Sequence, residues 1–268
     1  QYFERFGIAI VRRDGERLRP MVEKAMQQKV VSSVRPERTY HALGAPGVNR
    51  ADITQASFAA MANLDPDYLR GYRDGISELV DRLLGGEQAE SLRKAPPRID
   101  ETTSTWGLQA TKVIGSSLTG LGIKVAVLDT GFDHTHQDFV GRIITKKLFA
   151  SNSTEDDVHG HGTHCIGTAC GPLRPTTGPR YGIAYESEIY AGKVLGDDGF
   201  GTDRSIIAGM DWALDEGCHI ISMSLGAATQ MGDQPNDDYE QIGKVCLDAG
   251  TLVVAAAGNE SARPQQIN

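Results

Sequence analysis

The second half of this chain alternates short, almost wholly apolar segments with helical patterns, and this alternation constrains the fold more than any other feature. The apolar segments are residues 123–128, 188–194, 219–223 and 251–257. Strands buried on both faces of a parallel sheet read as continuous apolar runs of this kind. Residues 206–214 and 239–247 lie between them, with apolar side chains at helical spacing. The pattern predicts an α/β domain with a mainly parallel, buried sheet and flanking helices.

The first 99 residues follow another pattern and predict a separate, smaller domain. Strand-like runs fall at residues 6–11, 30–34 and 39–43. Apolar residues between positions 18 and 26 recur at helical spacing, and a second helical block covers about residues 52–93. A proline-rich stretch at residues 94–98 is typical of a linker. We therefore expect a small α+β domain at residues 1–99, with the block at 52–93 as a helical insert, followed by the α/β domain at residues 100–268.

Composition and charge exclude several classes of function. The 268 residues carry 27 Lys and Arg against 35 Asp and Glu, a formal net charge of −8. This acidic balance argues against nucleic acid as the main partner, because binding a run of phosphates requires a surplus of cations. The longest apolar stretch, residues 252–257, is far shorter than the roughly 20 residues of a membrane span. The four cysteines are too few for a disulfide scaffold, and we interpret them as small buried hydrophobic residues.

Three polar motifs follow predicted strands, at the edge where parallel sheets carry their active sites. Asp129 ends an apolar strand, and a carboxylate buried there requires a hydrogen-bonding or charged partner. His161 begins a small-residue helix that directs it toward the strand end bearing Asp129. A histidine oriented by a buried carboxylate is a general base. Asn259 follows the last apolar strand, where a side-chain amide can donate a hydrogen bond to a developing oxyanion.

Two of these motifs have simpler interpretations when each is taken alone. Asp129 can cap a turn, and the pair Gly258-Asn259 is most often a turn as well. The triplet Asp-Thr-Gly that begins at Asp129 also occurs in aspartic proteases, in which two carboxylates share a proton. This chain holds one such triplet, and Phe132 stands where that family has a small hydroxyl residue.

The histidine cluster has a metal-binding alternative. His159, His161 and His164 resemble the zinc signature of metallo-β-lactamase-like hydrolases, and neutral imidazoles this close in sequence can bind zinc. However, Thr163 stands at the position where that signature has an aspartate. Zinc binding by the three histidines would overturn the general-base hypothesis.

The order of five segments along the chain resembles the subtilisin-like serine proteases, the subtilase family. Residues 124–132 look like that family's Asp segment, and residues 161–168 look like its His segment, with Ile166 where alanine is usual. The segments that resemble its substrate-binding and oxyanion regions are residues 192–201, 222–226 and 254–260. The resemblance implies a subtilisin-like fold and a serine endopeptidase that hydrolyses peptide bonds through an Asp-His-Ser triad.

The resemblance also assigns roles to single residues. Asp129 orients His161, which acts as general base and then as general acid, while Asn259 donates to the oxyanion. Polypeptide substrates would pair with an edge segment and fill pockets beside it. Because Asp203 is acidic, we expect it to favour a basic or polar substrate side chain a few positions before the cleaved bond. The implied substrate-binding residues are Gly199, Phe200, Gly201, Asp203, Ser224, Leu225, Gly226, Ala256, Ala257 and Gly258.

The family's remaining segment, Gly-Thr-Ser-x-Ala with the nucleophile, has no counterpart in these 268 residues. In the family this segment lies beyond the asparagine. We therefore expect the polypeptide to continue past Asn268, or a second chain to supply the missing part of the catalytic domain. The alternative is a catalytically inactive binding or inhibitory module derived from a subtilase.

The N-terminal region resembles the family's inhibitory propeptide, which also assists folding. On this hypothesis the chain is a zymogen, and residues 1–99 are its own intramolecular inhibitor. We expect the maturation cut between Ile99 and Ser104, with the released end in the substrate groove beside residues 199–201. The resemblance further implies secretion.

The resemblance implies that the chemistry requires no cofactor. Structural calcium is common in the family, and Asp138 matches the position of one family ligand. The calcium-binding loop that usually follows the His helix is not evident, because the proline-rich residues 171–179 stand there. We therefore assign no metal site from the sequence.

Overall fold

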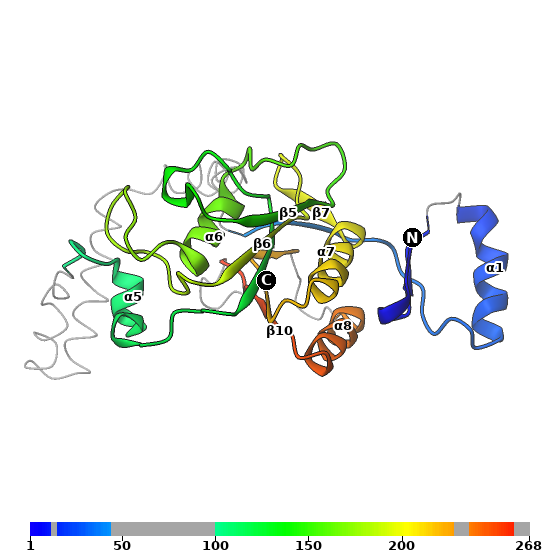
Figure 1. Cartoon of the computed structure of the whole chain (residues 1–268). Helices are drawn as coiled ribbons and strands as arrows, with labels where there is room; N and C mark the ends of the chain where they lie inside the picture. The colour runs from blue at the N-terminus through cyan, green and yellow to red at the C-terminus, as the bar shows by residue number, and fades with distance from the viewer. Residues whose placement is uncertain (12–14, 44–99, 228–235, 260–268) are drawn as a thin grey trace, which may run out of the picture.

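The computed structural model describes residues 1–11, 15–43, 100–227 and 236–259 (Figure 1). The helical insert expected at about residues 52–93 lies outside the described residues, as does the linker expected at residues 94–98. No helix among the described residues is long and apolar enough to cross a membrane.

A five-stranded parallel sheet forms the centre of the molecule, in the order β10-β8-β4-β6-β5. Its strands are β4 (Lys124–Asp129), β5 (Ile144–Leu148), β6 (Glu188–Lys193), β8 (Ile220–Met223) and β10 (Leu252–Ala255). The parallel sheet and four of its strands are confirmed, with bounds that differ by a few residues. β5 was not predicted. It lies at the edge of the sheet, where alternate residues such as Thr145 and Lys147 face solvent, so it lacks a continuous apolar run.

Helices cover both faces of this sheet, and the alternation of side chains along β4 decides which face each residue joins. Val125 and Val127 pack with Ile166 of α6 (His161–Cys170). Ala126 and Leu128 belong to the cluster on the other face, which includes side chains of α7 (Asp203–Asp215) and α8 (Asp237–Asp248). Successive side chains of a strand point to opposite faces. Asp129 therefore points to the same face as Val127, toward α6.

Further elements lie outside the central sheet and the helices that cover it. They include β1 (Tyr2–Phe3), η1 (Glu4–Phe6), β2 (Ile8–Ala9), α1 (Gly15–Gln27), α5 (Trp106–Ala110), η2 (Val113–Gly115) and η3 (Gln137–Phe139). Among them, β1 packs against α7 and η1 packs against α8. Phe3 and Phe6 are buried in the cluster that contains α7 and α8. Arg5 holds the same region by ion pairs of 2.8 Å to Asp211 and 2.6 Å to Asp215.

The strand expected at residues 30–34 is wrong. The backbone N–H groups of Val30 and Val31 both donate to the carbonyl of Ala25, at 2.9 and 3.4 Å, so they close the end of α1. The side chains of Val30 and Val34 are exposed, at 76% and 56%. Apolar β-branched residues form a strand only where a neighbouring strand accepts them, and this segment has no such neighbour among the described residues.

A second, three-stranded sheet brings the N-terminal region to the carboxyl edge of the large sheet. β3 (Thr39–Ala42) lies between β7 (Phe200–Thr202) and β9 (Leu225–Gly226), and is antiparallel to both. Figure 1 shows the long blue stretch of chain that leads from α1 back toward the sheet, and β3 lies at the end of this stretch. The strand expected at residues 39–43 is confirmed, and its two partners come from the segments expected to bind substrate.

Candidate active site

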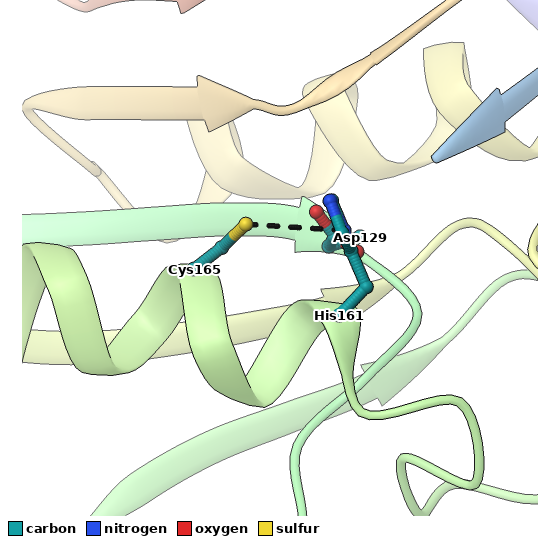
Figure 2. Close-up of side chains that lie close together, drawn as sticks. All are labelled: Asp129, His161 and Cys165. Carbon is teal, nitrogen blue, oxygen red and sulfur yellow. Dashed lines mark hydrogen bonds and ion pairs between the residues drawn. The ribbon is translucent and has the colours of Figure 1, made fainter. Parts of the chain in front are cut away.

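A buried carboxylate and an imidazole meet at the carboxyl end of β4. Nδ1 of His161 lies 2.7 Å from Oδ1 of Asp129, and the two side chains are 10% and 1% exposed. The same carboxylate oxygen accepts a 2.7 Å hydrogen bond from the backbone N–H of Thr130. Figure 2 shows the pair with Cys165, whose Sγ lies 3.8 Å from Nδ1 of His161. The pair that the sequence predicted is therefore formed.

Two glycines allow α6 to begin directly against the chain that leaves β4. Gly131 has a φ of +109°, a backbone conformation that favours glycine. A Cβ atom on Gly162 would lie 2.3 Å from the carbonyl oxygen of Gly131, which is closer than any side chain tolerates. This close approach sets the distance between His161, at the first turn of α6, and Asp129.

Asp157, which sequence reasoning missed, holds the loop before α6. Its carboxylate accepts hydrogen bonds from Thr130 Oγ1 and the N–H of Gly160, both at 2.8 Å. It also accepts from Thr163 N at 2.8 Å and Thr163 Oγ1 at 2.6 Å. Burial alone would raise the pKa of Asp157, but these hydrogen bonds outweigh it and lower the pKa. The sequence signal for Asp157 was an acidic residue a few positions before the glycine that precedes α6. A carboxylate there can accept hydrogen bonds from the free N–H groups at the start of a helix.

Lys193 is a second residue that sequence reasoning missed. It ends β6 beside Asp129, and its side chain is only 1% exposed. Its ammonium donates to the carbonyls of Thr130 at 2.7 Å and Asp156 at 2.8 Å, and pairs with Asp197 at 2.7 Å. A buried charge requires such partners. Lys193 thus ties three loops together around the catalytic edge of the sheet.

Both nitrogens of His161 face hydrogen-bond acceptors. Nδ1 faces Asp129, and Nε2 lies 2.9 Å from the carbonyl oxygen of Leu43. Each nitrogen must therefore carry a proton, so the ring is an imidazolium in this state. The hydrogen bond to Asp129, supported by Cys165 and opposed by burial, raises the pKa of His161 to about 11. With both ring nitrogens protonated, His161 has no lone pair left to accept a further proton in this state.

β3 lies beside His161, in a groove between the two segments that the sequence predicted to bind substrate. Ala42 donates its backbone N–H to Gly199 O, and Leu43 donates its backbone N–H to Ser224 O, both at 3.0 Å. The Leu43 side chain is buried, and a Cβ on Gly226 would lie 3.1 Å from its Cδ1. Four further pairs set the register. Tyr40 pairs with Gly201, His41 with both Phe200 and Gly226, and Ala42 with Leu225. Six of the predicted substrate-binding residues therefore surround one extended strand.

The segment in this groove differs from the one we expected. We expected the chain near residue 99 to lie beside Gly199–Gly201, and the structure places Thr39–Ala42 there instead. Ser104 forms an isolated bridge with Arg180, and its neighbour Thr105 donates to the carbonyl of Arg180 at 2.9 Å. Ser104 ends the segment in which we expected the cut. It pairs with Arg180 and not with the residues of the groove.

Asp203 contacts Arg38, the residue before β3, in another way than we expected of a substrate contact. Its Oδ2 accepts a 2.7 Å hydrogen bond from the backbone N–H of Arg38, and its Oδ1 accepts from the Tyr239 hydroxyl at 3.1 Å. Its backbone N–H donates to the carbonyl of Arg38 at 3.2 Å. Asp203 is therefore engaged by backbone and hydroxyl donors.

The remaining predicted residues follow β10 at the same edge of the sheet. Ala256 donates its backbone N–H to Met223 of β8 at 3.1 Å. Ala257, Gly258 and Asn259 come next along the chain, and Gly258 has a φ of +99°. Their contact with substrate, and the oxyanion role of Asn259, stay predictions.

The two alternative interpretations of the motifs do not match this geometry. Among the described residues, the group whose possible metal-ligating atoms lie within 4.8 Å of one another is Asp129, His161 and Cys165. His159 and His164 are not part of it, and His164 is exposed. The partner of Asp129 is His161, whereas an aspartic protease would require a second carboxylic acid there.

Three of the four cysteines are buried and all four are free, but Cys165 is only half-buried beside His161.

Asp138, the position that matches a calcium ligand of the family, does not fit a cation here. Its oxygens accept hydrogen bonds from Thr176 N at 2.6 Å, Thr176 Oγ1 at 2.7 Å, Thr177 N at 3.2 Å and Tyr181 OH at 2.8 Å. The Thr177 hydroxyl donates as well. These hydrogen bonds outweigh burial and lower the pKa of Asp138. Protein N–H and O–H groups thus engage the carboxylate oxygens with which Asp138 would ligate a calcium ion.

Comparison with known proteins agrees with this site. Residues 120–268 match the subtilase family of peptidases, which is more than half of the chain. The chain therefore belongs to the subtilase family. Subtilisin BL from Lederbergia lenta is 41% identical over 160 residues, which cover 59% of this chain and 56% of that protein. Thermitase from Thermoactinomyces vulgaris is 38% identical over 141 residues, which cover 52% of this chain and 48% of that protein.

A more distant relative matches beyond the subtilase region. A subtilisin-like serine protease from Cochliobolus lunatus is 29% identical over 243 residues, which cover 84% of this chain and 45% of that protein. This match extends toward the N-terminus past residue 120. The chain spans about half the length of these relatives.

Proposed function

We propose that this chain is the zymogen portion of a serine endopeptidase in which Asp129 and His161 activate a serine that lies outside these 268 residues. The observation that carries the proposal is the buried Asp129–His161 pair with a strand of the chain itself presented to it in the groove. The serine comes either from a continuation of the polypeptide past Asn268 or from a second chain.

The described residues support each proton transfer of peptide hydrolysis. Asp129 fixes the imidazole through Nδ1. Once β3 has left Nε2 and the ring is neutral, Nε2 of His161 can take the serine proton as the hydroxyl attacks the peptide carbonyl. The carboxylate stabilises the imidazolium that forms. Asn259 donates to the oxyanion of the tetrahedral intermediate. His161 then gives its proton to the leaving amine, and a water molecule repeats the sequence to release the acyl group.

We also propose that the N-terminal region inhibits this site until it is removed. Nε2 of His161 is engaged by Leu43 O, and residues 39–42 fill the positions where substrate backbone would pair. Both must leave before a substrate can bind. The carbonyl presented to His161 belongs to the Leu43–Gly44 bond, so we propose this bond as the maturation cut, in place of one between Ile99 and Ser104. Secretion is proposed on the family resemblance alone.

Labelling with a fluorophosphonate probe tests the triad. The complete polypeptide should react and hydrolyse casein, and the 268-residue chain should stay unlabelled. Because removing one member of such a triad, subtilisin's included, costs about 10⁴- to 10⁶-fold in rate, His161→Gln should abolish measurable hydrolysis. His164→Gln is the matched control, since His164 lies one turn along the same helix and is exposed. Full activity of the His161→Gln variant would refute the proposal.

The same experiment decides between the enzyme and an inactive binding module. The filled groove is the observation that favours a module. A complete polypeptide that never reacts with the probe, while its groove still binds a peptide with the sequence of residues 38–43, would establish the module instead.

A further inference from the structure

The helix α6 begins without a side-chain cap of its own, because its N-cap residue is Gly160. The first N–H groups of a helix have no partner within the helix and need acceptors from elsewhere. Asp157 meets part of this need. The hydroxyl of Thr130 meets another part, since it accepts a 2.8 Å hydrogen bond from the N–H of Gly162. The start of α6 is therefore capped by the residue that follows β4.

This hydrogen bond runs beside the one that joins Asp129 to His161. Thr130 follows Asp129 and Gly162 follows His161, so two consecutive pairs of residues are linked, at 2.7 and 2.8 Å. The backbone N–H of Thr130 also donates to Oδ1 of Asp129 at 2.7 Å. Thr130 therefore holds the carboxylate with its N–H and the helix that bears His161 with its hydroxyl.

Asp157 sets the orientation of the Thr130 hydroxyl. A hydroxyl has one proton to donate and two lone pairs that accept. Oγ1 of Thr130 donates its proton to Oδ1 of Asp157 at 2.8 Å, so its lone pairs are left for the N–H of Gly162. Thr130 is 0% exposed, so bulk water does not compete for either bond. The carboxylate of Asp157 thus keeps the hydroxyl in the orientation that accepts from α6.

The pair of Asp129 and His161 depends on such support. Among the described residues, Oδ2 of the buried Asp129 has no hydrogen-bond partner, so Oδ1 alone carries the bonds of this carboxylate. A carboxylate held through one oxygen can turn about its Cβ–Cγ bond unless the groups around it are fixed. A general base must also lie within hydrogen-bond reach of the proton that it takes. The contacts of Thr130 fix both sides of the pair at once.

We propose that Thr130, its hydroxyl oriented by Asp157, is a positioning residue that keeps His161 aligned on Asp129 for proton transfer. The inference rests on the proposed protease function and adds two residues to its machinery. Both act through the pair and contact neither the substrate nor the attacking serine.

The first test compares Thr130→Val with the wild type, using the active protease obtained from the complete polypeptide well below its melting temperature. Valine keeps the shape of the side chain and removes the hydroxyl. We expect kcat on a peptide substrate to fall about 10- to 100-fold with KM within about 2-fold, because alignment of the base is lost while substrate binding is kept.

Two further variants control this measurement. Thr130→Ser should restore kcat to within about 3-fold of the wild type, since serine offers the same donor and acceptors. Thr168→Val is the matched control and should keep the wild-type kcat. The hydroxyl of Thr168 lies on the exposed side of α6 and donates to the carbonyl of His164.

The pH dependence of kcat/KM separates positioning from a purely structural role. The acidic limb of this profile reports the pKa of His161 in the free enzyme, because the base must be neutral to act. The titratable groups that face His161 are Asp129 of β4 and Cys165 of α6. A weaker hydrogen bond to Asp129 lowers the pKa of His161, so Thr130→Val should move the midpoint down by about 0.5 to 1 pH unit. A variant that is only less stable would lose active molecules without moving the midpoint.

A double-mutant cycle tests whether Asp157 acts through Thr130. If it does, Asp157→Asn and Thr130→Val together should lower kcat about 5-fold less than the product of their single effects. A double variant that equals the product would overturn the part of Asp157 in the inference. If Asp157→Asn does not fold, the Thr130 variants decide the inference alone.

Three results would each overturn the inference: a wild-type kcat in Thr130→Val, no rescue by Thr130→Ser, or an unmoved midpoint. If the complete wild-type polypeptide hydrolyses no peptide, the proposed function fails, and NMR titration of the 268-residue chain decides the inference. There the pKa of His161 should be about one unit lower in Thr130→Val than in the wild type, and unchanged in Thr168→Val. An equal pKa in Thr130→Val and the wild type would show that Thr130 does not align the pair.

Discussion

Replacing Asp129 by asparagine should lower the pKa of His161 from about 11 toward its ordinary value of 6.5, because the first cause of the raised value is the hydrogen bond to Asp129. At an effective dielectric constant of about 20, unit charges separated by 2.7 Å attract by about 6 kcal/mol. Desolvation of the buried carboxylate offsets part of this, and removing one partner of a buried pair costs about 3–5 kcal/mol. We expect a loss of that size in the free energy of unfolding at pH 6.

The pH dependence of this loss has a definite sign. The folded-state pKa of His161 lies above its unfolded value, so the folded chain binds the extra proton and the pair stabilises it fully below about pH 6.5. The contribution falls as pH rises and is lost as pH passes through about 11. The difference in stability between the wild type and Asp129→Asn should therefore shrink steadily across this window.

Two measurements on the 268-residue chain check this reasoning. Side-chain NMR titration, with the His161 signal assigned by its absence in His161→Gln, gives the pKa directly. Urea unfolding at pH 6 and at pH 10.5 gives the stability difference. Asp133→Asn is the matched control, because Asp133 accepts its hydrogen bonds from Thr135. A wild-type His161 that titrates within about one unit of 6.5 would refute the assignment of an imidazolium in this state.

Three further predictions concern the support of the site. Gly162→Ala should lower the free energy of unfolding by about 1–3 kcal/mol in a urea melt, because the new methyl would lie 2.3 Å from the Gly131 carbonyl oxygen; an unchanged midpoint would contradict that close approach. A calcium chelator should leave the melting temperature of the wild type unchanged. Asp138→Asn should lower the melting temperature by a few degrees, because the N–H and O–H groups that donate to Asp138 lose a charged acceptor. A chelator that lowers the melting temperature of the wild type but not that of Asp138→Asn would point to bound calcium. Lys193→Met should cost about 1–3 kcal/mol in thermal unfolding, since two carbonyls and a carboxylate lose a buried donor; wild-type stability would show that those acceptors find other donors.

Much of the central sheet and its helices could be predicted from consecutive residues. The apolar runs at β4, β6, β8 and β10 and the helical spacing in α7 and α8 are local patterns, and both survive in the fold. β5 was missed because an edge strand needs only one buried face, so Thr145 and Lys147 interrupt its apolar run. Residues 30–34 were misjudged because strand propensity carries no information about whether a partner strand will be available.

Asp129 and His161 were also readable from the sequence, because both follow predicted elements and their order matches a known family. The supporting residues Asp157 and Lys193 were not, since their importance depends on loops that meet only in the folded chain.

The sequence by itself determined most of the segments that become buried strands, and it placed Asp129 and His161 at the edge of the sheet. The tertiary structure alone decided what fills the groove. Residues 39–41 pair with residues 200–202 across some 160 positions of chain, and no local propensity encodes such a contact. The protonation of His161 depends on the same contact, because Leu43 O faces its second nitrogen only when β3 is docked. Local patterns arise from steric preferences of neighbouring residues, whereas a pKa or a pocket arises from whichever distant groups packing brings within a few ångströms.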